Sequence, residues 1–227
     1  MIKLTWLSHA SWYIETQSMR ILLDPFFTDN PKATAKADDF ADCTHILVSH
    51  GHFDHVADVA AVAEKSGAQV IAIFEIAQWL QQKSQLSNVM GMNIGGKVDV
   101  PDGSVKMVPA IHSSVLPDGS YGGMPAGFVL NFGDRRIYFA CDTAYFSDMK
   151  WYAGGVDIAV LPIGDLYTMG VHDSIQATKL IEPKYVLPTH YDTWPPIEQN
   201  AAHWAAEVRS ETDAEPVVLQ VGETFEV

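Results

Sequence analysis

The strongest pattern in the sequence lies at residues 45–55, which read His45-Ile46-Leu47-Val48-Ser49-His50-Gly51-His52-Phe53-Asp54-His55. Its first half is a short apolar run, which predicts a buried β-strand over residues 45–49. Its second half places four side chains that can bind a metal within six residues. Such a pattern has odds of roughly one in a thousand of arising by chance. The stretch therefore predicts a metal site that begins directly after a strand.

Three more candidate ligands stand just past the carboxyl ends of other apolar runs, and these are His112, Asp142 and His190. In sheets with parallel strands, ligand sites gather at this end. The count allows two divalent metal ions: His50, His52 and His112 on one, Asp54, His55 and His190 on the other, and Asp142 as a bridge. Imidazole and carboxylate ligands suit zinc, the preferred metal here, and also manganese, iron or nickel.

Hydrophobic periodicity predicts strands and helices that alternate along most of the chain. The expected strands cover residues 2–7, 12–15, 21–23, 45–49, 69–74, 98–100, 105–110, 128–132, 137–141, 158–161, 185–187, 217–221 and 224–227. The expected helices cover residues 56–65, 76–83, 174–181 and 197–209, and a polar loop covers residues 28–42. Each half opens with strands and ends in strand–helix alternation. The pattern predicts one domain, residues 1–227, of the α/β or α+β class, with two mixed sheets face to face and helices outside both.

Composition excludes several classes of partner. Asp and Glu number 28 against 14 Lys and Arg, for a net charge of −14. This balance disfavours nucleic acid and anionic membrane as partners. No apolar run approaches the length of a membrane span or resembles a leader peptide, and the two cysteines lie far apart in the sequence. We expect a cytoplasmic protein with reduced thiols that acts on a small molecule, and a homo-oligomer is compatible with the sequence.

Three polar residues near the start of the chain are further candidates. His9 follows the first expected strand and could donate a proton or contact substrate, or serve the structure alone. Asp24 ends another strand, where it could accept a hydrogen bond from a ligand histidine or form only a turn. Asn30 is the weakest of the three.

A loop between Gly164 and Gly170 carries the last group of candidates. Tyr167 and Thr168 lie in this loop, and His172 follows it. The loop could shape the substrate site or act as a lid. The alternative is an ordered surface loop that leads into a helix.

The order of the seven ligands resembles that of the metallo-β-lactamase superfamily. Four flanking motifs resemble a small branch of metal-dependent hydrolases that is similar to the ascorbate-6-phosphate lactonases: Ser8-His9-Ala10-Ser11, Leu23-Asp24-Pro25-Phe26 with Asn30-Pro31, Tyr167-Thr168-Met169-Gly170, and His190-Tyr191-Asp192-Thr193-Trp194-Pro195. The resemblance covers nearly the whole chain. It implies an αββα sandwich and a metal-dependent hydrolase, and it leaves the substrate open.

The expected chemistry is hydrolysis by a hydroxide that bridges two metal ions. A divalent metal can lower the pKa of its water to about 7. We expect attack on a small ester, lactone or phosphoester, with Asp54 holding one metal and orienting the nucleophile. The alternative is a non-hydrolytic diiron redox protein or metal sensor. His52 speaks against the diiron form, because the flavodiiron relatives usually carry Glu at that position. The acidic charge disfavours a nuclease.

Overall fold

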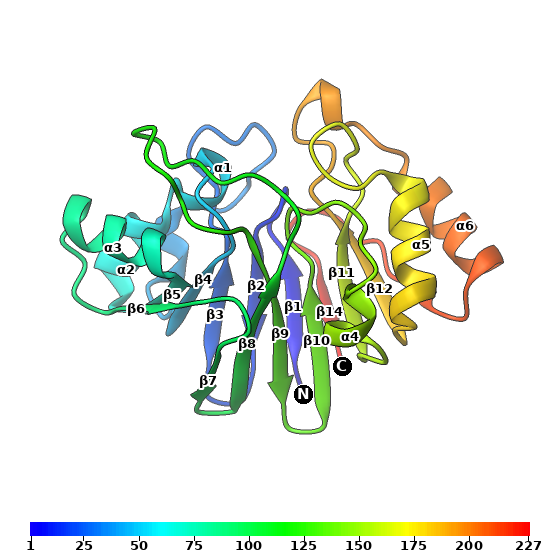
Figure 1. Ribbon diagram of the computed structural model, residues 1–227, viewed down its shortest axis with the longest axis horizontal. Coiled ribbons are helices and arrows are strands. Elements are labelled where there is room, and N and C mark those ends of the chain that lie inside the picture. Colours follow the sequence, from blue (N-terminus) through cyan, green and yellow to red (C-terminus); the bar gives the residue numbers. More distant parts are fainter.

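The computed structural model describes residues 1–227 and arranges them as two packed β-sheets with helices outside both (Figure 1). The first sheet has seven strands in the order β14-β1-β2-β3-β4-β5-β6. These are β1 Lys3–Trp6, β2 Trp12–Glu15, β3 Arg20–Leu23, β4 His45–Val48, β5 Gln69–Ile73, β6 Val89–Met92 and β14 Thr224–Glu226. Pairing is antiparallel from β14 to β3 and parallel from β3 to β6.

The second sheet repeats this arrangement with seven strands in the order β13-β12-β11-β10-β9-β8-β7. These are β7 Lys97–Val100, β8 Gly103–Pro109, β9 Ala126–Phe132, β10 Arg135–Phe139, β11 Ile158–Pro162, β12 Tyr185–Thr189 and β13 Glu215–Pro216. Pairing is antiparallel from β7 to β10 and parallel from β10 to β13. Both sheets are mixed, and the predicted αββα sandwich is confirmed.

The helices pack on the parallel halves of the sheets. They are α1 Phe53–Val56, α2 Val59–Ser66, α3 Phe74–Lys83, α4 Met149–Ala153, α5 Val171–Ile181 and α6 Ala201–Glu211, with two 3₁₀ turns, η1 Ala37–Phe40 and η2 Pro195–Ile197. α2 and α3 pack on the first sheet, and α5 and α6 pack on the second, on opposite sides of the molecule in Figure 1. None of these helices combines the length and apolarity needed to cross a membrane.

The core fills the space between the sheets and beneath the helices, and it contains 62 buried residues. Trp12 shows how the two sheets are joined. Its ring meets the Phe139 ring edge to face, with centroids 6.0 Å apart. Its indole Nε1 donates a hydrogen bond to Thr189 Oγ1 across the sandwich, at 3.0 Å. The indole therefore contributes apolar area and also satisfies its one polar atom.

The topology brings one set of strand ends together. β1, β3 and β4 run parallel in the first sheet, as do β8, β10 and β12 in the second. The loops that follow these strands lie at the upper end of Figure 1, away from both termini. Every candidate ligand sits in one of these loops or in the short helix α1, as expected for a site at the carboxyl ends of strands.

Several expected elements differ from the structure. The strand expected over residues 217–221 is wrong, because β13 comprises only Glu215–Pro216. After the Val217 N–H donates a hydrogen bond to the Val186 carbonyl, the chain leaves β12 and crosses to the first sheet, where β14 pairs with β1. The helix expected over residues 197–209 begins only at Ala201, where the Asn200 side chain accepts a hydrogen bond from the His203 backbone N–H. The helix expected over residues 56–65 is divided into α1 and α2. The sequence patterns missed β6 and α4.

Candidate metal centre

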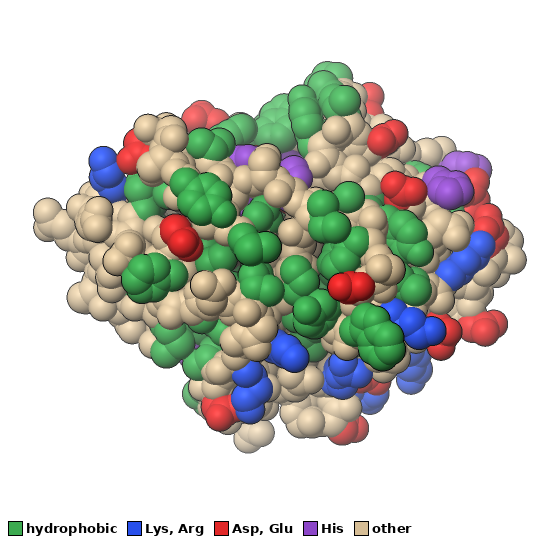
Figure 2. Space-filling view, viewed as in Figure 1, with side chains coloured by type: hydrophobic (Ala, Val, Ile, Leu, Met, Phe, Trp, Pro, Cys, Tyr) green, Lys and Arg blue, Asp and Glu red, His purple; other side chains and the backbone are tan.

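Seven predicted ligands and His9 converge at the carboxyl ends of the strands. Three overlapping groups have ligand atoms within 4.8 Å of one another: His50 with His52 and His112; His50 with His55 and Asp142; and His9 with Asp54, His55 and His190. The groups share His50 and His55, so they form one continuous cluster. Figure 2 shows histidine atoms at the upper edge of the molecule, between projecting hydrophobic side chains.

Asp142 lies at the middle of the cluster. Its Oδ2 atom is 3.0 Å from His190 Nε2, 3.4 Å from His55 Nε2 and 3.7 Å from His112 Nε2. His55 lies in α1, which follows β4 of the first sheet, whereas His112 and His190 lie in loops of the second sheet. Asp142 therefore lies within 3.7 Å of histidines from both halves of the predicted ligand set.

Asp24 orients two of the candidate ligands from beneath. Its Oδ2 accepts hydrogen bonds from His55 Nδ1 at 2.9 Å and from the Ser49 hydroxyl at 2.5 Å. Its Oδ1 accepts from the Ser49 backbone N–H at 2.7 Å. The same Ser49 hydroxyl lies 3.0 Å from His50 Nδ1. Because Nδ1 of His50 and of His55 are both engaged in this way, the Nε2 atoms are the ones presented to the cluster.

His9 is fully buried between two polar partners. Its Nε2 lies 2.9 Å from Asp54 Oδ2, and its Nδ1 lies 2.8 Å from the Thr193 hydroxyl. A carboxylate only accepts, so Nε2–H donates to Asp54 and the Thr193 hydroxyl donates to Nδ1. His9 thus fixes the orientation of a candidate ligand.

Several residues around the site that are not glycine have a left-handed backbone conformation, with positive φ. φ is +52° at His9, +44° at Asp24, +54° at Cys141 and +54° at His190. Such conformations cost free energy and persist where the surrounding structure imposes them, commonly at functional sites. His9, Asp24 and His190 each follow a strand, and their side chains contact other members of the cluster, whereas Cys141 turns the chain directly before Asp142.

Burial and mutual charge set the protonation of the cluster. Burial, together with the neighbouring His190, lowers the pKa of His9 to about 3. Burial also lowers the pKa values of His50, His52 and His112. These four imidazoles are therefore neutral at pH 7, the form that binds a metal.

The pKa values of His55, Asp142 and Asp54 shift in the direction that keeps each side chain charged. Burial alone would lower the pKa of His55, but the surrounding carboxylates of Asp142, Asp54 and Asp24 raise it well above its usual value. Burial would raise the pKa of Asp142, but His190 and His55 hold it well below the usual range, and His55 and His9 lower the pKa of Asp54 in the same way. The carboxylates are ionised, and they attract positive charge to this point.

The donor atoms fit divalent metal ions. Three buried polar atoms in the cluster have no hydrogen-bond partner: His55 Nε2, Asp142 Oδ1 and His190 Nδ1. Leaving buried polar atoms unpaired costs free energy, and in native proteins such atoms point to an unaccounted ion or to function. An imidazole and carboxylate donor set with unpaired atoms at its centre is the chemistry of a zinc, manganese, iron or nickel site.

A cavity of about 830 Å³ opens above the cluster. Five of the candidate ligands form its floor: His52, Asp54, His112, Asp142 and His190. Its walls come from α1 and three loops and are formed by Phe53, Ser113, Val115, Leu116, Pro117, Leu166, Tyr167 and Trp194. The volume is within the range of small-molecule sites.

Some candidates from the sequence lie elsewhere. Asn30 does not reach the cavity, because its amide donates to the Ser8 hydroxyl and the Phe26 carbonyl and holds the loop. Thr168 turns its hydroxyl to the Met169 carbonyl. His172 lies in the first turn of α5 with its side chain 82% exposed. His9 does not line the cavity either, because Asp54 and Trp194 lie around it. Tyr167 does line the cavity.

Several residues that build the site were not among the candidates predicted from the sequence. Ser49 and Thr193 orient histidines, and Phe53, Leu166 and Pro117 line the cavity. Ser49 and Phe53 are adjacent to His50 and His52, and Thr193 lies three residues after His190, so proximity to ligands was the available signal. Nothing in the local sequence indicates which loop residues face the cavity.

Comparisons with known proteins agree with this geometry. Residues 19–191 match the model of the beta-lactamase superfamily domain. A UPF0173 metal-dependent hydrolase of Salinibacter ruber is 43% identical over 86% of this chain and 87% of its own length. One of Pyrococcus furiosus is 41% identical over the full length of both. The structure of Igni18, a metallo hydrolase from the archaeon Ignicoccus hospitalis, superposes with a TM-score of 0.89 at 32% identity and covers 100% of this chain and 99% of the other. The chain belongs to the UPF0173 metal-dependent hydrolases of the β-lactamase superfamily.

Proposed function

We propose that this metal-dependent hydrolase cleaves a small ester, lactone or phosphoester with a hydroxide held between two divalent metal ions, zinc being the preferred metal. The observation that supports the proposal most is the convergence of seven imidazole and carboxylate side chains, five of which form the floor of a cavity, with unpaired buried atoms at their centre. When bound, two divalent cations lower the pKa of a shared water and polarise the scissile carbonyl or phosphoryl group.

The residues divide into two metal-binding sets joined by one carboxylate. His50, His52 and His112 would hold the first ion; Asp54, His55 and His190 would hold the second; and Asp142 would bridge the two. The grouping is supported by the ligand atoms of His50, His52 and His112, which lie within 4.8 Å of one another, as do those of Asp54, His55 and His190. Asp142 lies within 3.7 Å of histidines from both sets.

The remaining polar residues position the ligands. Asp24 holds the rings of His55 and, through Ser49, of His50. His9 holds Asp54, which lines the cavity and is placed to orient the attacking water. His9 is buried, and its lowered pKa keeps the ring neutral, with its proton on Nε2. Its role is therefore to hold the Asp54 carboxylate in one orientation.

A substrate panel with one matched pair of variants tests the proposal. The zinc-loaded protein is assayed against 4-nitrophenyl esters, γ- and δ-lactones and bis(4-nitrophenyl) phosphate. We expect hydrolysis of at least one class, and a loss of at least about 100-fold in kcat/KM for His52→Ala, because losing a direct ligand should cost more than the about 10- to 100-fold typical of losing a hydrogen-bond partner of a ligand. His172→Ala removes an exposed imidazole outside the cavity and is the control, with unchanged kcat/KM.

Two results would contradict the proposal. One is the absence of hydrolysis across the whole panel by protein that carries its full complement of metal. The other is an equal rate in His52→Ala and the wild-type protein. Iron-loaded protein that consumes oxygen and hydrolyses nothing would instead favour a diiron redox role.

A further inference from the structure

The cavity above the metal centre has two chemically different surfaces. Its floor consists of candidate metal ligands. Of the eight other lining residues, seven are apolar or aromatic, namely Phe53, Val115, Leu116, Pro117, Leu166, Tyr167 and Trp194, and Ser113 is the only remaining polar one. The part of a substrate that does not react would therefore contact hydrocarbon and aromatic rings.

Four of these side chains are exposed to solvent. Phe53, Val115, Leu166 and Tyr167 are between 48% and 66% exposed, and they are four of the eleven large hydrophobic residues that the fold leaves exposed. Exposed apolar side chains gathered in one place mark a binding surface. A bound substrate with an apolar body would remove this area from water, which favours binding.

The loop that carries Leu166 and Tyr167 is held in a strained conformation. Asp165 and Leu166 have φ of +60° and +38°, a region that a branched apolar residue rarely adopts. Backbone bonds from Asp165 N–H to the Met169 carbonyl and from Met169 N–H to the Thr143 carbonyl fix the turn. The turn presents Leu166 at the cavity and away from the core, so its exposure follows from imposed backbone geometry.

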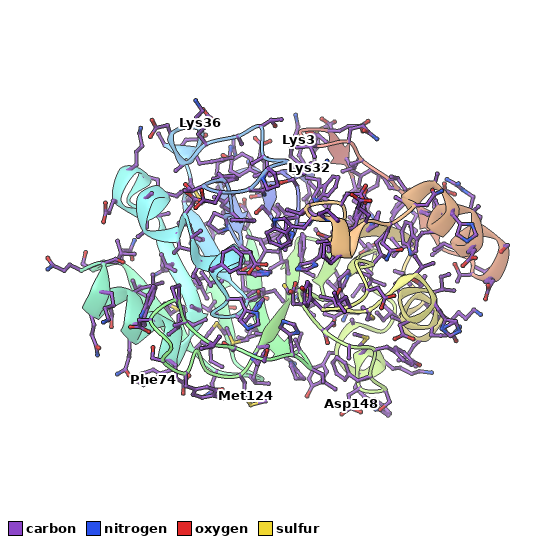
Figure 3. The ribbon with its side chains drawn as sticks, turned by 90° about the horizontal axis from the view of Figure 1, so that it is seen from above. Lys3, Lys32, Lys36, Phe74, Met124 and Asp148 are labelled. Atoms are coloured by element: carbon purple, nitrogen blue, oxygen red, sulfur yellow. The ribbon has the colours of Figure 1, made fainter.

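The cavity has no positively charged Lys or Arg side chain in its lining. None of the 14 Lys and Arg side chains lines it. Lys83, which reaches the neighbouring loop, pairs with Asp118 at 3.2 Å. Figure 3, which looks down on this end of the molecule, places Lys3, Lys32 and Lys36 together on one side and Phe74, Met124 and Asp148 on the opposite side. An anionic group on the substrate, away from the bond that is cleaved, would find no cation in this cavity.

We infer that the part of the substrate that does not react is uncharged and apolar, as in an ester or lactone with a hydrocarbon or aromatic body. The inference rests on the proposed hydrolase function and narrows it. It excludes substrates with a second anionic group, such as phosphorylated sugars and dicarboxylic half-esters. The apolar walls would hold the hydrocarbon or aromatic part, and the scissile carbonyl would lie over the floor.

Two esters that differ only in a terminal charge test the inference. 4-Nitrophenyl hexanoate and mono-4-nitrophenyl adipate share the leaving group and the chain length, and the second ends in a carboxylate. We expect kcat/KM for the hexanoate to exceed that for the adipate by at least about 10-fold after correction for uncatalysed hydrolysis. Leu166→Lys places an ammonium group at the cavity and should reduce this ratio several-fold. Trp151→Lys makes the same change at a residue that is 84% exposed and outside the cavity, and should leave the ratio unchanged.

A binding measurement tests the apolar character of the cavity independently of hydrolysis. N-phenyl-1-naphthylamine is an uncharged apolar dye that fluoresces in apolar sites. We expect it to bind the metal-loaded protein, and Leu166→Asp to weaken binding at least about 10-fold while Trp151→Asp does not. A preference for the adipate, or dye binding that Leu166→Asp leaves unchanged, overturns the inference. If neither ester is cleaved but dye binding depends on Leu166, the apolar site stands and the proposed hydrolysis of such esters fails.

Discussion

The Nδ1 atom of His55 lies 2.9 Å from Oδ2 of Asp24, and neither side chain is exposed to solvent. This hydrogen bond fixes the rotation of the imidazole ring. It leaves Nε2 unpaired and 3.4 Å from Asp142, at the centre of the candidate metal site. A residue 31 positions away in the sequence therefore determines how a ligand histidine is presented.

Asp24→Asn should weaken metal binding while it keeps a polar side chain of similar size at this buried position. The amide has nearly the same size, but it carries no charge, and its NH₂ group would face N–H or O–H donors of His55 and Ser49. We expect zinc affinity to fall by about 10- to 100-fold, as is typical when a hydrogen-bond partner of a ligand histidine is lost. Competition with a chromophoric chelator measures the change. Asp148→Asn, on the exposed side labelled in Figure 3, is the control, and equal affinities of the two variants would contradict the role of Asp24.

Thr193→Val should reduce turnover while zinc remains bound. Valine keeps the shape of threonine but removes the hydroxyl that donates to His9 Nδ1, so His9 no longer has a fixed tautomer to offer Asp54. We expect kcat to fall about 10-fold with KM unchanged. Thr193→Ser retains the hydroxyl and should restore most of the rate. If the valine and serine variants have the same kcat, Thr193 acts only through packing.

Metal binding should release roughly one proton at pH 6. His55 has a raised pKa and is protonated in the metal-free protein at this pH, whereas the lowered pKa values of His50, His52 and His112 leave those rings neutral. A metal ligand must be deprotonated, so the His55 proton leaves when the ion binds. Release from His55 should decrease as the pH rises through its raised pKa. Calorimetric zinc titrations in buffers of different ionisation enthalpy measure the proton count, and a count of zero at pH 6 would show that His55 is already neutral.

Zinc should raise the melting temperature of the protein. Binding to the folded chain alone stabilises it by about 2.7 kcal/mol when free metal is at 100 times Kd. For a domain of this size, each 1 kcal/mol corresponds to about 2–4 °C, so we expect an increase of about 5–10 °C. Scanning calorimetry with zinc and with excess chelator provides the comparison. Identical melting temperatures would mean that the buried cluster does not bind the ion in the native state.

The sequence was sufficient for the sandwich and for the convergence of the ligands. Strands such as β4 and β12 are short apolar runs, and parallel pairing brings the residues after them, His50 and His190, to one edge. The four possible metal ligands between residues 50 and 55 indicated where the site begins. The hydrogen bond from His55 to Asp24 could also be anticipated, since Asp24 ends β3 beside β4.

The rest depended on loop geometry, which local patterns do not specify. Leu166 lines the cavity only because the turn at Asp165 and Leu166 adopts positive φ at residues other than glycine. His172 is close to this loop in the sequence, but α5 begins at Val171, and the helix directs His172 to solvent. Val217 and its neighbours have high β-propensity, but after the bond from the Val217 N–H to the Val186 carbonyl the chain crosses from the second sheet to the first.

The number of metal ions bound per chain shows whether the seven ligands form a site for two ions. Metal-free protein is titrated with zinc, and native mass spectrometry counts the bound ions in the wild-type protein and in Asp142→Ala, which removes the bridging carboxylate. The two ligand sets joined by Asp142 predict two ions in the wild-type chain and fewer in the variant. A wild-type chain that binds fewer than two zinc ions at saturating metal, or a variant that still binds two ions with the wild-type affinity, would contradict this prediction.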